Sequence, residues 1–348
     1  MALASPPTST PIPHPARLNT LNAYLYHHGY RMGKLIGEGS YSKVRLCPRR
    51  SDTEDHEKDP AVACKVINKR KASSDFVNKF LPRELQIVSK IKHFNIVRVY
   101  DVVEFDYYVY IFMDYCNNGD LLEYVKQRGF IKETRSQLYF RQVLSAVKYL
   151  HGLDIAHRDL KCENVLLTAE DQVRLSDFGF ARTCRDSQSG KRILSNTYCG
   201  SCAYAAPEIL QGTAYNPKLY DMWSLGCILF IILTGHMPFD ESNVPKMLQN
   251  QMERNLNYPH QMEGVISKSA KRLIRFHANI QNELYKIVRT VRILVSLGSR
   301  TGVLKYQRGI FPFFKFFYLF CTPITMLIAI KLYMLLSNLT KSKPHVIR

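Results

Sequence analysis

The first thirty residues contain no long apolar run, and this absence argues against a secretory signal peptide. The stretch instead holds five prolines among serines and threonines, so we expect residues 1–29 to form a disordered lead. Without an export signal, the nine cysteines indicate reduced thiols in a cytoplasmic protein rather than a disulfide framework. Cys199 and Cys202 are spaced like a metal-binding pair, but no second pair accompanies them, and this lack disfavours a zinc site.

Acidic residues are scarce, because 29 Asp and Glu accompany 48 Lys and Arg and give a formal charge of +19. The excess is uneven: from Ala278 onward 11 Lys and Arg occur with the single acid Glu283. Basic and aromatic residues are not interleaved as in RNA-binding domains, so we expect no nucleic-acid partner.

Two short motifs contain the residue types that phosphoryl transfer needs. Residues 157–164 read His-Arg-Asp-Leu-Lys-Cys-Glu-Asn, and residues 177–179 read Asp-Phe-Gly. This chemistry requires a base near the attacking hydroxyl, cations on the phosphates, and side chains that hold those cations. Asp159, Asn164 and Asp177 fit these three requirements.

Further motifs follow a fixed order along the chain. Residues 36–44 read Ile-Gly-Glu-Gly-Ser-Tyr-Ser-Lys-Val, residues 62–65 read Val-Ala-Cys-Lys, and Ala-Pro-Glu follows at 206–208. In this order the motifs resemble those of eukaryotic protein kinases. The resemblance implies an α+β, two-lobed fold, with a small β-rich lobe at 30–113 and a larger helical lobe at 114–277. ATP and Mg²⁺ would bind in the cleft between the lobes.

Lys65 and Glu84 form a predicted ion pair. Lys65 lies in an apolar strand at 61–67, where an unpaired ammonium is costly to bury. Glu84 lies in a segment at 80–91 whose apolar residues have helical spacing, and the resemblance pairs it with Lys65. Other residues that the resemblance assigns to nucleotide binding are Ile36, Gly37, Glu38, Gly39, Ser40, Val44, Ala63, Asp114, Cys116 and Leu166.

The resemblance also assigns roles around the reacting hydroxyl. Asp159 would orient this hydroxyl and accept its proton, Lys161 would stabilise the transferring phosphate, and Asn164 with Asp177 would hold Mg²⁺. Lys161, two residues after Asp159, is typical of serine/threonine kinases. We therefore expect protein substrates phosphorylated on Ser or Thr.

The resemblance also implies how the activity is regulated and which substrate sequences are preferred. Thr197 lies ten residues before Pro207 and is the predicted activating phosphosite, which Arg158 would bind. Ser201 would belong to the substrate floor and hydrogen-bond toward Asp159 and Lys161. The carboxylates that would receive an arginine three residues before the target are Asp120 and Glu163.

Four stretches are similar to the testis-specific serine/threonine kinase family: residues 37–44, 79–84, 119–123 and 199–208. The similarity covers residues 30–277 and implies a role in spermatogenesis or sperm function. This family usually has proline where Cys202 stands, which affects the expected shape of the substrate floor.

The composition changes after residue 277. Residues 278–348 form a basic and apolar tail, and 316–336 is long enough to span a bilayer. Pro312 and Pro323 would interrupt such a helix, and the Lys331 side chain would have to reach the membrane surface. Three origins stay open: a nonhomologous tail from splicing or the gene model, which we favour, a membrane anchor, and a divergent helical completion. The large lobe would then be incomplete and would need a chaperone, and Glu208 would lack its arginine. A truncated, noncatalytic or tail-anchored scaffold or decoy is the alternative function.

Overall fold

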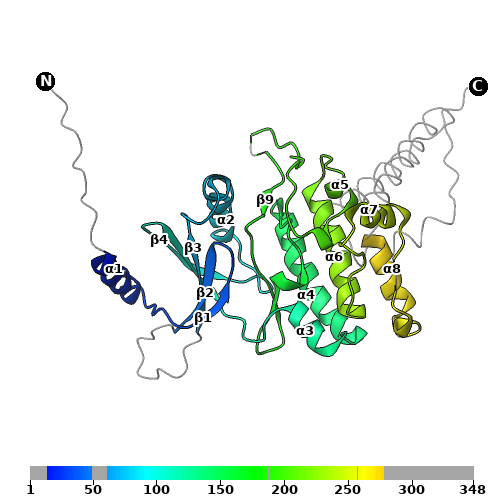
Figure 1. Cartoon of the computed structure of the whole chain (residues 1–348), viewed down its shortest axis with the longest axis horizontal. Coiled ribbons are helices and arrows are strands. Elements are labelled where there is room, and N and C mark those ends of the chain that lie inside the picture. The colour runs from blue at the N-terminus through cyan, green and yellow to red at the C-terminus, as the bar shows by residue number, and fades with distance from the viewer. Residues whose placement is uncertain (1–13, 49–60, 187, 257, 278–348) are drawn as a thin grey trace, which may run out of the picture.

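The computed structural model describes residues 14–48, 61–186, 188–256 and 258–277. A small lobe of strands lies beside a larger lobe of helices (Figure 1). This arrangement confirms the predicted α+β kinase-like fold. The predicted membrane segment at 316–336 and the rest of the tail lie outside the described residues.

The small lobe is built on one antiparallel sheet with the strand order β1-β2-β3-β5-β4. Its strands are β1 (Leu35–Glu38), β2 (Ser42–Cys47), β3 (Val62–Asn68), β4 (Val99–Phe105) and β5 (Tyr108–Asp114). The apolar segment predicted as a strand is β3, which lies in the middle of the sheet and is mostly buried. Its pairing places Lys65 between Val44 of β2 and Ile111 of β5.

Helix α2 (Leu81–Val88) covers one face of this sheet through a cluster that includes Leu81, Ile67 and Ile111. A π-helical turn, η1 (Phe76–Phe80), precedes it, and the N–H of Leu81 bonds to the carbonyl oxygen of Phe76. Pro82 follows directly and has no N–H to donate, so the usual hydrogen-bond ladder is interrupted at this point. The helix predicted from apolar spacing is therefore present, with an irregular first turn.

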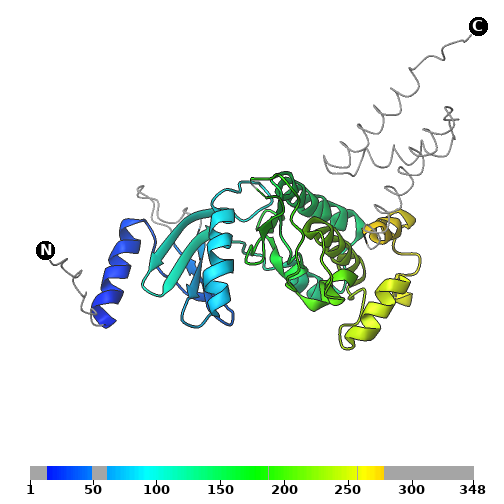
Figure 2. The same cartoon turned by 90° about the horizontal axis from the view of Figure 1, so that it is seen from above.

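The expectation of a disordered lead fails for residues 14–27, which form helix α1 (His14–His27). Leu21 and Leu25 are spaced i, i+4 on this helix, and both are buried. They pack with Tyr30, whose ring stacks on Phe112 at a centroid distance of 3.8 Å. These buried apolar contacts stabilise a helix despite the prolines nearby, and they place α1 against the strands of the small lobe (Figure 2). Residues 1–13 lie outside the described residues.

The large lobe is mostly helical. Its longer helices are α3 (Leu121–Arg128), α4 (Glu133–Gly152), α6 (Pro217–Thr234), α7 (Val244–Glu253) and α8 (Lys268–His277). Shorter elements carry the loops of the site: β6 (Ile155–Ala156), η2 (Cys162–Asn164), β7 (Val165–Leu167), β8 (Val173–Leu175), β9 (Arg182–Thr183), η3 (Cys202–Tyr204), α5 (Pro207–Leu210) and η4 (His260–Met262).

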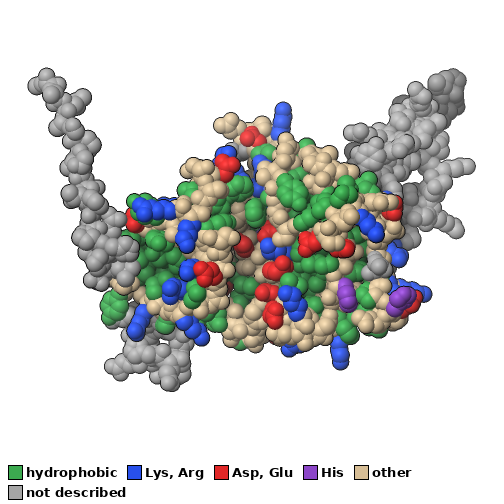
Figure 3. Space-filling model, in the orientation of Figure 1, with side chains coloured by type: hydrophobic (Ala, Val, Ile, Leu, Met, Phe, Trp, Pro, Cys, Tyr) green, Lys and Arg blue, Asp and Glu red, His purple; other side chains and the backbone are tan. Residues whose placement is uncertain are grey.

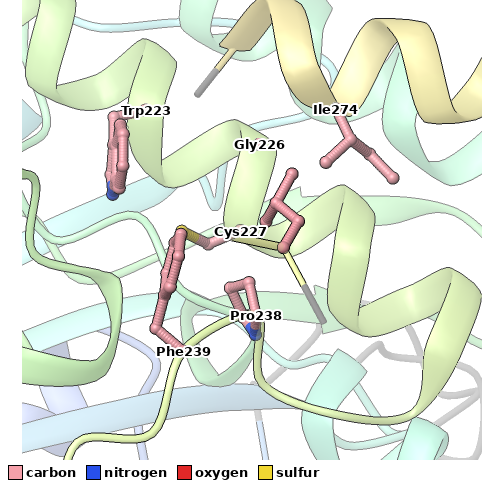
Figure 4. A pocket seen from close by; sticks show the side chains of 7 residues that line it. Trp223, Gly226, Cys227, Pro238, Phe239 and Ile274 are labelled. Carbon is pink, nitrogen blue, oxygen red and sulfur yellow. The ribbon is translucent and has the colours of Figure 1, made fainter. Parts of the chain in front are cut away.

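Helix α6 is the centre of the large-lobe core. Among the described helices it alone is long and apolar enough to cross a membrane, but most of it is buried within the lobe, as in the core helix of a globular domain. A small apolar pocket lies beside it and is lined by residues that include Trp223, Cys227, Phe239 and Ile274 (Figure 4). None of the predicted nucleotide, metal or substrate residues lines this pocket.

The end of the described large lobe is well packed. Ile274 and His277 of α8 are buried, and Nδ1 of His277 donates to the carbonyl oxygen of Met222 at 2.9 Å. Burial lowers the pKa of His277 to about 4. Glu208 is half-buried and does take part in an interaction, so it is not a fully buried carboxylate without a partner, while the expected lack of an arginine stays a prediction.

Candidate active site

Lys65 lies between two carboxylates. Its Nζ is 3.1 Å from Oε1 of Glu84 and 3.1 Å from Oδ1 of Asp177. Burial alone would lower the pKa of Lys65, but the two carboxylates outweigh it and raise this pKa above its usual value. Lys65 in turn holds the pKa of Asp177 below its usual range. The strand, the helix and the Asp-Phe-Gly segment therefore meet at one cation.

Asp159 lies at the centre of a second group of contacts. Its Oδ2 is 3.0 Å from Nζ of Lys161 and accepts a hydrogen bond from Nδ2 of Asn164 at 3.1 Å. Its Oδ1 accepts from the backbone N–H of Ser201 at 3.1 Å, and Nζ of Lys161 donates to Oγ of Ser201 at 2.9 Å. The structure thus brings together the predicted catalytic pair and the predicted serine of the substrate floor.

A buried carboxylate on α6 fixes the start of the catalytic loop, residues 157–164, which carries Asp159. Asp221 accepts the backbone N–H groups of His157 and Arg158 at 3.0 and 2.8 Å, and it also contacts Nε2 of His151 at 2.8 Å. Sequence reasoning assigned no role to Asp221 or His151. A single carboxylate inside the apolar run of α6 is the signal that could have identified it, because such a group needs buried donors.

Arg158 and Asp177 both adopt left-handed backbone conformations, with φ of 65° and 58°. Such angles are costly for residues with a side chain, and they persist where surrounding contacts enforce them. The contacts of Asp221 with the backbone N–H groups of His157 and Arg158 enforce the conformation of Arg158. The ion pair with Lys65 holds the side chain of Asp177 in place.

The predicted nucleotide residues lie on the strands that border the lobe junction. Ile36, Gly37 and Glu38 are in β1, Gly39 and Ser40 form the turn after it, Val44 is in β2, Ala63 is in β3, and Leu166 is in β7. Beyond these predictions, Tyr41 of the turn packs on Phe76 at a centroid distance of 4.4 Å. This contact joins the glycine-rich loop to the beginning of the helical segment that carries Glu84.

Two further predicted nucleotide residues, Asp114 and Cys116, have defined surroundings. The carboxylate of Asp114 accepts the Tyr100 hydroxyl at 2.6 Å and the Arg98 N–H at 2.9 Å, so this side chain is engaged within the small lobe. Burial raises the pKa of Cys116 to about 12, which keeps its thiol neutral.

The oxygen atoms near the junction suit magnesium. Asp177 is 44% exposed, so its carboxylate is accessible to a cation. Asn164 uses its amide nitrogen on Asp159, and no hydrogen bond within the described residues uses its Oδ1. Carboxylate and amide oxygens are ligands that Mg²⁺ prefers, so these two residues fit the predicted metal role.

The two predicted substrate carboxylates are both partly exposed. Asp120 caps α3 by accepting the Glu123 N–H at 2.9 Å, and it forms a β-bridge with Leu166. Glu163 accepts the Tyr204 hydroxyl at 3.0 Å. Acidic side chains gather near the middle of the face in Figure 3, where the two lobes meet. This distribution suits a basic substrate residue.

In the unphosphorylated chain Arg158 contacts Ser195, and its predicted contact with a phosphate on Thr197 stays a prediction. Thr197 is exposed, whereas Nη1 of the buried Arg158 donates to Oγ of Ser195 at 3.0 Å. Ser195 is itself fully buried. Its burial depends on pairing with Tyr215, which no local pattern reveals.

Comparison with known proteins gives a consistent picture. Residues 30–291 match the model of the protein kinase domain family, 14 residues beyond the predicted end at 277. The chain is 49% identical to mouse (Mus musculus) testis-specific serine/threonine-protein kinase 1 over 238 residues, which are 68% of this chain and 64% of that protein. It is 46% identical to mouse kinase 2 of the same name and 43% identical to mouse kinase 3. These matches cover 68% of this chain, and 65% and 84% of the two relatives.

Proposed function

The chain belongs to the protein kinase family, and we propose that it transfers the γ-phosphoryl group of ATP to serine and threonine hydroxyls of proteins. The observation that carries this proposal is the grouping of Asp159, Lys161 and Ser201, together with a Lys65–Glu84 ion pair that also reaches Asp177. Because the chain matches less than two thirds of the length of the first relatives, 64% and 65%, the activity of the whole protein is part of the proposal.

We assign each residue the role that the family resemblance implies and that its contacts support. Lys65, held in place by Glu84, would bind the phosphates, while Asn164 and Asp177 would hold magnesium through oxygen atoms. When bound, ATP would supply the phosphoryl group and magnesium would neutralise the charge of the phosphates. Asp159 would orient the substrate hydroxyl and accept its proton, and Lys161 would stabilise the charge that develops in the transition state.

The transfer reaction can be tested with purified chain and the Asp177→Asn variant. We expect magnesium-dependent transfer to a serine peptide, with a loss on the order of 100-fold in the variant because a group that stabilises the transition state is removed. Glu104→Gln is the matched control, since Glu104 is an exposed carboxylate that pairs with Lys69 far from this group. Equal rates in the wild type and Asp177→Asn would contradict the proposal.

The proposal includes a preference for arginine three residues before the target. Asp120→Asn preserves the helix cap, because asparagine caps as well as aspartate, and Glu163→Gln preserves an acceptor for Tyr204. Both variants remove only charge. We expect the KM of an Arg-x-x-Ser peptide to rise about tenfold in each variant, the loss of one charge-assisted contact. Equal wild-type rates on peptides with and without this arginine would contradict the preference.

Activation by phosphorylation of Thr197 is a further part of the proposal. Thr197 is exposed and lies two residues from Ser195, which is in contact with Arg158. A phosphate dianion there would attract nearby guanidinium groups. Mass spectrometry should find phosphate at Thr197 in fully active protein, and a phosphatase-treated sample should keep only a lower, basal activity.

We also propose a cellular compartment and a biological process for the protein. The eight cysteines among the described residues are free thiols, which supports a reducing compartment such as the cytoplasm. The relatives are named testis-specific, and this supports a role in sperm formation or function. Cell fractionation of tagged full-length chain distinguishes the cytoplasm from a membrane attached through residues 316–336.

A further inference from the structure

Ser195 lies in the activation segment, the stretch between the Asp-Phe-Gly and Ala-Pro-Glu motifs, and is fully buried, with 0% of its surface exposed. Its backbone N–H bonds to the carbonyl oxygen of Tyr215 and its own carbonyl accepts the Tyr215 N–H, both at 2.9 Å. The Tyr215 hydroxyl in turn donates to the carbonyl oxygen of Thr197 at 3.0 Å. The position of Ser195 is therefore set by backbone pairing, independently of its side chain.

The Ser195 hydroxyl joins segments that are far apart in the sequence. Its Oγ accepts Nη1 of Arg158 at 3.0 Å and lies 3.4 Å from Nη1 of Arg182. The backbone N–H of Thr197 also points at this oxygen, at 3.4 Å. Arg158 directly precedes Asp159, and Arg182 begins β9 after the Asp-Phe-Gly segment. One oxygen atom thus contacts the catalytic loop, β9 and the predicted phosphosite.

The arginines around this oxygen repel one another. Burial, and then the guanidinium of Arg158, lowers the pKa of Arg182. Burial also lowers the pKa of Arg83 on α2, with added contributions from Arg182 and Arg158. Nε of Arg182 is buried and has no hydrogen-bond partner among the described residues. A neutral hydroxyl supplies an acceptor here, but it cannot neutralise this charge.

We propose that Ser195 is a positioning residue that holds Arg158 and Arg182 in place before Thr197 is phosphorylated, and so gives the unmodified chain a basal transfer rate. This inference rests on the proposed kinase function. Without the hydroxyl, two neighbouring guanidiniums lose their shared acceptor and separate. Arg158 also donates from Nε to the carbonyl oxygen of Phe180 at 2.8 Å, so its displacement would disturb the backbone between Asp177 and β9.

The inference predicts that the need for Ser195 depends on phosphorylation. A phosphate on Thr197 is a stronger, charged acceptor for the same arginines and would replace the hydroxyl. Loss of Ser195 should therefore reduce activity in the unphosphorylated chain and matter little once the phosphate is present. A serine with a purely structural role would matter equally in both states.

The test compares full-length wild type, Ser195→Ala and Ser195→Thr, each with threonine or with phosphothreonine installed at position 197. In the unphosphorylated chains we expect kcat of Ser195→Ala to fall about tenfold, since hydrogen bonds to charged groups contribute on this scale, while Ser195→Thr stays close to wild type. In the phosphorylated chains the difference should shrink to less than about twofold. Ser189→Ala is the matched control, because Ser189 is an exposed serine of the same segment whose hydrogen bonds are local, to Asp186 and Lys191.

Two outcomes would overturn the inference: equal rates for unphosphorylated wild type and Ser195→Ala, or an equal loss in both states. If Ser195→Ala fails to fold, Ser195→Cys keeps the side-chain volume with a poor acceptor and should show the same conditional loss. Amide hydrogen exchange of residues 182–204 gives a readout without catalysis and should speed up in unphosphorylated Ser195→Ala only. Unchanged exchange in unphosphorylated Ser195→Ala would contradict the positioning role of Ser195, whether or not the wild type is active. An inactive wild type would contradict the proposed kinase function.

Discussion

Nζ of Lys65 in the central strand lies 3.1 Å from Oε1 of Glu84 on helix α2, and Glu84 is only 4% exposed. This ion pair crosses from the sheet to the helix and sets the distance between them. Because Lys65 also contacts Asp177 of the large lobe, the position of the helix is coupled to the residue that would hold magnesium.

Glu84→Gln should therefore weaken catalysis more than folding. The amide still offers an oxygen to Lys65 but no charge, so we expect kcat/KM to fall by about tenfold to 100-fold, or roughly 1.5–3 kcal/mol. Steady-state kinetics and thermal unfolding measured on one sample would separate the two effects. Glu104→Gln removes the exposed partner of Lys69 and should change neither quantity noticeably. Unchanged kcat/KM in Glu84→Gln would show that the pair is dispensable.

Gly200→Ala should damage the substrate floor. Gly200 has φ of 92°, and an added Cβ would lie 2.6 Å from the Tyr220 hydroxyl and 2.8 Å from the Arg158 carbonyl oxygen. We expect a loss of about 1–3 kcal/mol in unfolding free energy and at least about a tenfold loss of activity, because Ser201 follows directly. The control is Gly212→Ala, where φ is 66° but no atom lies within 4 Å of the added Cβ. Its cost should be about 1 kcal/mol with normal activity.

Helix α1 should contribute to the stability of the small lobe. Leu25 is 1% exposed, so Leu25→Ala should lower the unfolding free energy by about 2–5 kcal/mol through lost packing and a residual cavity. Asn22→Ala on the same helix replaces an exposed residue and should have little effect. Urea denaturation followed by fluorescence measures both variants. Equal midpoints would show that α1 does not dock on the sheet in solution.

His277 should make the fold sensitive to mild acid. Its pKa is lowered by burial to about 4 from 6.5, so the folded state binds fewer protons than the unfolded state between these values. Stability should therefore fall as pH drops from about 6.5 toward 4, by at most about 3 kcal/mol from this group. His277→Gln should show a smaller fall between pH 7 and 5 in urea titrations. His260→Gln is the control, since His260 is fully exposed, and an identical pH dependence in His277→Gln and wild type would contradict this prediction.

The sequence was informative where motif order constrains the chemistry. Lys65, Glu84, Asp159 and Ser201 could be paired in advance because family resemblance supplies long-range partners that spacing alone does not. Helix α1 was missed because prolines outweighed the i, i+4 spacing of Leu21 and Leu25 in a short segment. Ser195 was missed because its environment depends on Tyr215, Arg158 and Arg182, which only the folded chain brings together.

The most direct test of the account is the initial rate of phosphoryl transfer from magnesium-ATP to an Arg-x-x-Ser peptide by full-length wild type and Asp159→Asn. Asparagine can keep a hydrogen bond to Ser201 but cannot accept the substrate proton, so the account predicts transfer by the wild type and a loss on the order of 100-fold or more in the variant. Both proteins should unfold at similar temperatures. A soluble, monodisperse wild type that transfers no phosphate, with Thr197 either phosphorylated or unmodified, would contradict the account.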